Sequence, residues 1–505
     1  MDFKEQFAIL VEQHKYEDAR ILLEQHSTYA SEDPFYYANM GWLYNHMERF
    51  QEAEILLRKG LTLFPDEAWM HSQLGFALDR QGKVEEGLES LQKALNMGFD
   101  EPWLHGEIGW CYKELKEYHK AIEYYENGLL DEPDNLWLLS QAAYMYLAVD
   151  QMDTAEEYFL KTYRLHKDVE SVGDLVYFYK HKGDFEQVIT YLKTLPEGDH
   201  EDWRAFELGV AYNQLGKYEL SLPHLKKALA LGRDDTSVRS QLADSYLYTG
   251  HNEEANESYN IALSYYEKAL KKEEEHYWIY QEMIWIAHKQ RDFQKKLEYL
   301  DRACKEREPD LWMMYHYSRV YSDLYDHVQA INACKFCMEH GEDSKEMYDL
   351  YAWNLGRADR EQEAIELLEK RVERYGSDEW TDGEIGWDYA QLQDYDKALA
   401  HFYKAVDLNP DNPLHLSMLA WCLLRKEDYA QAYAYAIQAQ EKGRNDGWLH
   451  SVLGEIHTGL HQVEKAIEEY QKALQDGYDE EWIHEELEKL HKQNQSVQAN
   501  DQEGS

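Results

Sequence analysis

The sequence is short of helix breakers, of cysteine and of positive charge. Only 9 Pro and 27 Gly occur in 505 residues, which favours long regular elements over a loop-rich architecture. Five Cys in so long a chain form no disulfide framework, so we expect a reducing compartment, the cytoplasm. The start, "MDFKEQFAIL", lacks the basic and apolar regions of a secretory signal.

Basic residues are outnumbered: 52 Lys and Arg stand against 98 Asp and Glu, a formal net charge of −46. Such a charge repels phosphate backbones, so we expect no nucleic-acid partner, and it favours partners that carry basic residues. No run approaches the roughly 20 apolar residues of a membrane helix, so we expect no membrane insertion. The sequence leaves the oligomeric state open.

Hydrophobic and aromatic residues are plentiful, and short fragments return along the chain. Residues 100–110 read "DEPWLHGEIGW" and residues 377–387 read "SDEWTDGEIGW". An enzyme needs its nucleophile or its metal ligands once, whereas copies at regular spacing indicate a structure repeated along the chain. No phosphate-binding loop, nucleophile motif or separate catalytic domain is evident, so we expect no catalytic residue and no cofactor.

The repeat is about 34 residues long. One slot, usually occupied by a small residue, recurs in steps of 34, with two steps of 33 and one of 41. Its positions are Ala19, Ala53, Gly87, Ala121, Ala155, Val188, Ser221, Ala255, Lys296, Ala330, Ala364, Ala398, Ala432 and Ala466. Around each, apolar residues at three- and four-residue spacing predict two amphipathic helices joined by a short turn. The chain therefore reads as an all-α stack of fourteen antiparallel helix pairs.

The same pattern predicts the domain organisation. Repeats one to eight span 1–270, with an extended second helix near 262–276 at the 41-residue step, and repeats nine to fourteen span 277–480. A lone solvating helix should follow at 481–492, because a stack needs one polar end. The polar residues 493–505 are expected to be disordered. Repeats five, six, eight and nine depart from the pattern, repeat nine by placing Lys296 in the small-residue slot.

Repeat four carries a family signature almost intact. Its signature residues are Ile108, Gly109, Tyr112, Tyr118, Ala121, Tyr125, Gly128 and Pro133. This pattern resembles the tetratricopeptide repeat, and the likeness extends over nearly the whole chain. The resemblance implies a right-handed superhelical solenoid whose first helices line a concave groove. It also implies binding of protein or peptide segments rather than catalysis.

All fifteen Trp fall in two slots of the first helix. The early slot holds Trp69, Trp103, Trp137, Trp203, Trp278, Trp312, Trp380, Trp448 and Trp482; the late slot, seven residues on, holds Trp42, Trp110, Trp285, Trp353, Trp387 and Trp421. Seven residues are nearly two helical turns, so both slots lie on one face. The residues then face either the groove, as an aromatic ladder, or the packing between repeats.

The groove reading gives the candidate binding residues. They are Trp42, Trp103, Trp110, Trp278, Trp285, Trp353, Trp380, Trp387 and Trp421, with Glu107 and Glu384 as acidic neighbours. In each copy the acidic pair before the helix is expected to cap its positive end. The primary hypothesis is therefore a scaffold that holds a protein or peptide segment. A peptide-gated regulator and a carbohydrate-related protein remain alternatives.

One cysteine pair has a spacing that could suggest a metal site. Cys334 and Cys337 are followed by His340, but they occupy slots filled elsewhere by Tyr125 and Gly128. Cysteine behaves as a small hydrophobe in such places, and no second pair supplies further ligands. We expect both to be core residues and no metal to bind.

Overall fold

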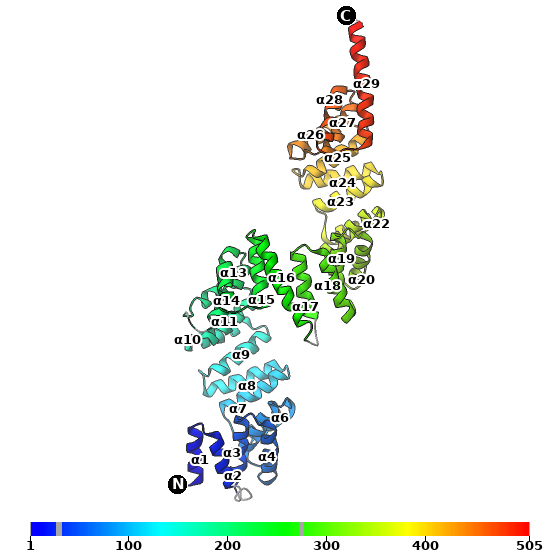
Figure 1. The fold of residues 1–505 in the computed structure, drawn as a ribbon. Coiled ribbons are helices and arrows are strands. Elements are labelled where there is room, and N and C mark those ends of the chain that lie inside the picture. The colour runs from blue at the N-terminus through cyan, green and yellow to red at the C-terminus, as the bar shows by residue number, and fades with distance from the viewer. Residues whose placement is uncertain (1, 27–32, 197, 199, 273–276, 504–505) are drawn as a thin grey trace. The chain divides into compact units, whose positions relative to one another are not determined.

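The computed structural model describes residues 2–26, 33–196, 198, 200–272 and 277–503, with side chains through residue 494. All regular structure in these ranges is helical, and the helices alternate as first and second members of hairpins (Figure 1). In these described residues twenty-nine helices make fourteen pairs and one final helix, so the predicted all-α solenoid of antiparallel helix pairs is confirmed. Odd-numbered helices are the first helices of the repeats.

The chain divides into two compact units, Met1–Tyr265 and Tyr266–Ser505. The division falls inside α16, a few residues before the boundary predicted at 270. The helices up to the division are α1 (Phe3–Glu12), α2 (Tyr16–Gln25), α3 (Phe35–His46), α4 (Phe50–Leu63), α5 (Ala68–Asp79), α6 (Val84–Asn96), α7 (Pro102–Glu114), α8 (Tyr118–Asp131), α9 (Leu136–Ala148), α10 (Met152–Leu165), α11 (Val169–Lys182), α12 (Phe185–Leu192), α13 (Glu201–Gln214), α14 (Tyr218–Ala230), α15 (Thr236–Tyr248) and α16 (Asn252–Ala269).

The second unit continues with the same alternation. Its helices are α17 (Tyr277–Lys289), α18 (Phe293–Glu306), α19 (Leu311–Asp323), α20 (His327–Glu339), α21 (Lys345–Arg357), α22 (Glu361–Tyr375), α23 (Glu379–Gln391), α24 (Tyr395–Leu408), α25 (Pro413–Arg425), α26 (Tyr429–Glu441), α27 (Gly447–Gly459), α28 (Val463–Gln475) and α29 (Glu481–Glu503).

Every hairpin turns through one residue with positive φ. In repeat four this residue is Lys116, at φ 62°, and the N–H of Glu117 then donates to the carbonyl of Tyr112 at 2.9 Å. This is the closure expected when a left-handed residue ends a helix. The fourteen positions are His14, Glu48, Gly82, Lys116, Asp150, Gly183, Gly216, Gly250, Arg291, Tyr325, Asp359, Gln393, Glu427 and His461. Only four are glycine, so the tight hairpin imposes the conformation on ordinary side chains elsewhere.

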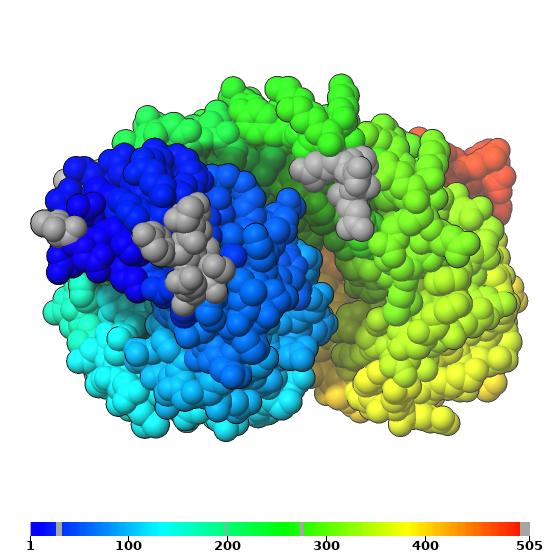
Figure 2. Space-filling view, turned by 90° about the horizontal axis from the view of Figure 1, so that it is seen from below, coloured from blue at the N-terminus to red at the C-terminus, as the bar shows by residue number. Residues whose placement is uncertain are grey.

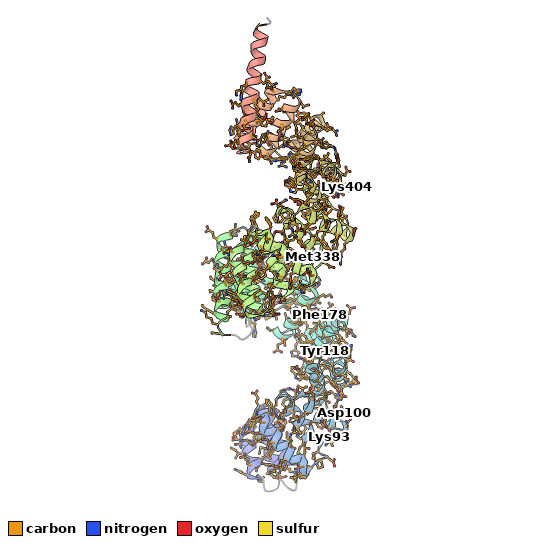
Figure 3. All side chains as sticks on the ribbon, turned by 90° about the vertical axis from the view of Figure 1, so that its right-hand side faces the viewer. Lys93, Asp100, Tyr118, Phe178, Met338 and Lys404 are labelled. Atoms are coloured by element: carbon orange, nitrogen blue, oxygen red, sulfur yellow. The ribbon has the colours of Figure 1, made fainter. Side chains whose placement is uncertain are left out.

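Asp side chains cap several first helices as expected. Asp378 accepts the N–H of Thr381, and Asp446 accepts that of Leu449, both at 2.9 Å. The expectation is wrong for the pair before α7, because Asp100 contacts His105 Nε2 at 2.6 Å. There the N–H of Leu104 donates to a backbone carbonyl in place of a cap. Figure 3 labels Asp100 in the turn before α7.

The recurrent glycine of the first helix marks a close approach of its own second helix. A Cβ at Gly109 would lie 2.8 Å from the ring of Tyr125, and one at Gly386 would lie 3.0 Å from Phe402. A Cβ at Gly75 would lie 2.5 Å from Leu91. The missing side chain therefore lets the two helices of a pair pack at short range.

Contacts between helices show which face is inner. Successive first helices touch each other, as α3 does with α5 and α23 does with α25, while contacts between successive second helices are weaker. First helices therefore lie on the inside of the curve within each unit. In Figure 2 the repeats of the first unit follow one another around such a curve, from blue to green. We call this first-helix side the inner face.

The atypical repeats differ visibly. The second helix of repeat six, α12, has only 8 residues, and that of repeat eight, α16, has 18, the longest second helix. The extension predicted near 262–276 ends at Ala269, and residues 273–276 lie outside the described residues. In repeat nine, Lys296 is buried in the small-residue slot.

The final helix covers the end of the stack. Ile483, Leu487 and Leu490 of α29 pack against Ala466 and Tyr470 of α28. The helix runs to Glu503, past the predicted end at 492 and through most of the tail predicted to be disordered. No proline or glycine interrupts residues 481–503, so nothing in the sequence stops the helix there. Residues 504–505 lie outside the described residues.

Candidate functional site

None of the fifteen tryptophans is buried. Trp137, Trp278, Trp285 and Trp380 are exposed, and the other eleven are half-buried. Core residues of similar size, such as Tyr125 and Phe402, have almost no exposed surface. The two Trp slots therefore mark a surface of the first helices that is partly open to solvent.

The early slot lies at the seam between repeats. The Trp137 ring packs against Gly106 of the preceding first helix, where a Cβ would approach it to 2.4 Å, and meets Tyr125 edge-on at 6.0 Å. Trp69 and Trp103, from consecutive repeats, meet edge-to-face at 5.9 Å. Aromatic pairs in this arrangement add to the packing of neighbouring repeats.

The late slot holds tryptophans beneath cations. Lys113 Nζ lies 3.9 Å from the Trp110 ring centroid, and the Arg357 guanidinium lies 5.6 Å from Trp353 and 5.4 Å from Trp387. These distances are typical of cation–π contacts. The cations come from the last turn of the same or the preceding first helix, so they link successive first helices across the inner face.

The repeated "GEIGW" fragment has one structural role in both units. Glu107 and Glu384 each meet an arginine from the preceding first helix: Arg80 donates to both Glu107 oxygens at 3.1 and 3.2 Å, and Arg357 lies 4.0 Å from Glu384. The final Trp of the fragment lies beside that same arginine. Each copy thus supplies the Glu and the Trp of a Trp–Arg–Glu contact between repeats, and the preceding repeat supplies the Arg.

Burial alters these acidic groups. Burial raises the pKa of Glu107 to about 7, although Arg80 opposes the shift. Burial likewise raises the pKa of Glu384 above its usual range, with Arg357 acting against it. Removing a carboxylate from water disfavours its charged form. These two predicted acidic neighbours therefore present less free negative charge to a ligand than the sequence suggested.

The first unit has a pocket of about 250 Å³ on the inner face. It is lined by Trp42, Asn45, His46, Trp69, Gln73, Phe76 and Trp103. Asn45 donates to the Gln73 carbonyl at 2.9 Å, and its own Oδ1 is buried without a hydrogen-bond partner among the described residues. The walls are aromatic and carry no formal charge with His46 neutral, so the pocket suits an apolar side chain.

The second unit has a larger pocket, of about 390 Å³. Its lining consists of Arg357, Gly383, Glu384, Trp387, Phe402, Leu414, His415, Met418, Arg444 and Trp448. Like the first pocket, it includes early-slot and late-slot residues of successive first helices, here Trp387, Leu414 and Trp448, and it adds Phe402 from the second helix α24. Its size falls within the range of ligand pockets.

The candidate residues from the sequence divide between these places. Trp42, Trp103, Trp387 and Glu384 line the two pockets. Trp110 and Glu107 join Arg80 in the Trp–Arg–Glu contact of the first unit. Trp278, Trp285, Trp353, Trp380 and Trp421 are partly exposed but line neither pocket.

Sequence reasoning missed the arginines and the histidine of the second pocket. Arg357 could have been found, because an arginine also stands four residues after the late slot at Arg80 and Arg425. His415 contacts Glu379 through Nε2 at 3.0 Å, and its Nδ1 is buried without a partner among the described residues. No repeated pattern in the sequence singles out His415.

Cys334 and Cys337 lie fully buried against Met347, in the core positions expected for them. Burial raises the pKa of Cys334 to about 12 and that of Cys337 to about 11, so both are thiols at neutral pH. In the part of the chain that the structure describes, no helix is long and apolar enough to cross a membrane.

Comparison with known families agrees with this architecture. Three family models, each described as tetratricopeptide repeat, match residues 3–168, 205–235 and 389–456. The chain belongs to the tetratricopeptide repeat family. The matched segments lie in both units, and members of this family act as scaffolds for protein interactions.

Solved tetratricopeptide repeat structures are among the similar chains. The crystal structure of the APC/C hetero-tetramer Cut9–Hcn1 matches at 14% identity and TM-score 0.41, covering 97% of this chain and 95% of that one. A tetratricopeptide repeat protein from Parabacteroides merdae ATCC 43184 matches at 18% identity and TM-score 0.37, covering 46% and 93%. Yeast Tom70 matches at 14% identity and TM-score 0.36, covering 86% and 96%.

Proposed function

We propose that this tetratricopeptide repeat protein holds segments of partner proteins on the inner face of its first helices, without catalysing a reaction. The observation that supports this most is the pair of pockets, one in each unit, built from the same tryptophan slots. Tryptophan combines a large apolar surface with little conformational freedom to lose, so it serves well as a binding anchor.

The chain's charge acts on partners at longer range. A net charge of −46 attracts segments that carry Lys or Arg and speeds their encounter with the protein. Since Glu107 and Glu384 face arginines of the protein itself, this attraction comes from acidic residues spread over the surface rather than from the pockets. We therefore propose basic residues in the partner outside the pocket-bound anchors.

A tryptophan substitution tests the proposal. Trp387 is half-buried and lines the second pocket, so Trp387→Ala should remove a binding wall at a modest cost in stability. We expect at least a tenfold loss of retention of capped random peptides containing one central Phe. The matched control is Leu408→Ala, at an exposed apolar residue on the second helix α24 of the same repeat.

Unfolding curves of both variants accompany the binding measurement. Equal peptide retention by wild type and Trp387→Ala would contradict a role of this pocket in binding. An unfolding midpoint that falls by the several kcal/mol of a buried aromatic deletion would instead identify Trp387 as packing.

A further inference from the structure

In three repeats an arginine stands at the end of the first helix or directly after it, four residues after the late slot, but the carboxylate partners of these arginines differ. Arg80 pairs with Asp79 and with both oxygens of Glu107. Arg425 donates to both oxygens of Glu455 at 2.8 and 2.9 Å. Arg357 has one ion pair among the described residues, to Glu384 at 4.0 Å, which is beyond hydrogen-bonding distance.

The Arg357 guanidinium is nevertheless held in place. It lies between the rings of Trp353 and Trp387, at 5.6 and 5.4 Å, and it lines the second pocket. These two rings limit where the guanidinium can lie, and no carboxylate among the described residues is within hydrogen-bonding distance of it. A planar guanidinium with free N–H groups is the group best suited to grip a carboxylate with two parallel hydrogen bonds.

The other polar groups of the pocket agree with an anionic guest. Arg444 lies 4.4 Å from the Trp448 ring, donates to Ser417 and pairs with Asp446 at 3.0 Å. Glu384 is the one acidic residue of the lining. A cationic guest would meet two guanidinium groups and one carboxylate, whereas a carboxylate would supply the partner that Arg357 lacks.

The rest of the lining requires an apolar companion. Leu414 is exposed, and Phe402 and Met418 are buried beneath the pocket floor. Trp387 and Trp448 complete the apolar walls. A single carboxylate leaves most of the roughly 390 Å³ unfilled, so an aromatic side chain beside it is needed to cover these walls.

We propose that this pocket binds an internal Asp or Glu side chain of a partner segment through Arg357, together with a neighbouring aromatic side chain between Trp387 and Trp448. The proposal deepens the function proposed above and depends on it. It assigns opposite charge preferences to two parts of one surface: basic residues along the acidic exterior, and one acidic anchor in this pocket.

The test uses the full-length protein and three sets of random decapeptides, acetylated and amidated so that no free terminus remains. The sets carry a fixed central Phe-Glu, Phe-Gln or Phe-Lys. We expect the wild type to retain the Glu set about tenfold more than the Gln set, as a charge-assisted hydrogen bond would give. Arg357→Gln should lose this preference and still retain peptides through Phe.

The control is Arg360→Gln, which removes an exposed arginine that pairs with Glu363 at the start of α22, a second helix. This variant should keep the wild-type preference. Unfolding curves of both arginine variants verify that the second unit remains folded.

The outcomes separate the two proposals. Equal retention of the Glu and Gln sets, preference for Lys, or a preference for Glu that survives Arg357→Gln would overturn the carboxylate inference. If those equally retained sets are released by Trp387→Ala, the inner face still binds peptides. Retention of none of the sets would overturn both proposals.

Discussion

Asp388 and Asp382 lie on the same helix, α23, in opposite electrostatic surroundings. Asp388 is buried, and its Oδ1 has no hydrogen-bond partner among the described residues. Burial, and secondarily the charge of Glu384, raises its pKa to about 8. For Asp382, burial acts upward, but hydrogen bonds from His401 and Ser377 outweigh it and lower the pKa. Substituting each by Asn should therefore change stability in opposite directions.

The magnitude for Asp388 follows from linkage. A carboxyl whose pKa is higher in the folded state contributes full stability below its unfolded pKa of about 4, and loses it as pH rises toward 8. At pH 7 about three pH units of that loss have accrued, at about 1.4 kcal/mol each, which gives roughly 4 kcal/mol as an upper bound. Asp388→Asn imitates the protonated form and should recover part of this energy.

The assay is urea unfolding of the full chain between pH 4.5 and 8, followed by circular dichroism. Asp388→Asn should raise the midpoint of the transition of the second unit at pH 7 to 8, with a gain that shrinks toward pH 4.5. Asp382→Asn should lower that midpoint by a similar amount throughout this range, because the depressed pKa of Asp382 lies below pH 4.5. A gain at Asp388 that is absent, or equal at all pH values, would refute the burial argument.

Two further predictions concern residues that occupy unfavourable positions. Burial lowers the pKa of Lys296 to about 8, so Lys296→Met should stabilise the second unit at pH 7 by up to about 3 kcal/mol, with a smaller gain at pH 10, measured by the same unfolding assay. Gln393 holds φ at 59° in its hairpin turn, so Gln393→Gly should be neutral or stabilising by up to about 1 kcal/mol. Gly82→Ala, at the matching turn, should destabilise by about 1 kcal/mol; the reverse order of these two effects would contradict a strained turn.

The sequence predicts the repeat architecture well because the same residue types pack at the same positions in most repeats. The slot of Ala121 and Ala398 is fully buried in both repeats, and Gly109 and Gly386 stand where an aromatic ring of the second helix needs room. Fourteen copies of such a pattern average out the exceptions, so the helix pairs and their order follow from the spacing alone.

The left-handed turns could not be read from residue types. Lys116, Tyr325 and Gln393 all have positive φ, although none is a residue that favours it. Positive φ is required because a short turn must close between two packed helices. The hairpin therefore determines the backbone conformation, whichever residue occupies the turn. Position in the repeat is a better guide here than identity.

The chemistry of the inner face was only partly visible in the sequence. The two tryptophan slots could be recognised from the sequence. The partners of Glu107 and Glu384 could not, because they lie 27 residues earlier, in the preceding repeat, at Arg80 and Arg357. A pattern search within one repeat does not pair them. Once the stack is known, the spacing between successive first helices predicts the Trp–Arg–Glu contact.

The net charge of the chain and the preference proposed for one pocket act over different distances. At physiological ionic strength, charges on an exposed surface are screened beyond about 8 Å. In the functions proposed above, the acidic exterior therefore governs how segments approach, while Arg357 governs a contact made within hydrogen-bonding distance inside a partly apolar pocket. The arginine is not neutralised by the surrounding acidity, because the nearest carboxylate, Glu384, stays 4.0 Å away and is itself shifted toward its neutral form by burial. A strongly acidic protein can thus keep a site for an acidic side chain, provided that the site contains one of its few cations beside the tryptophans that repeat along its first helices.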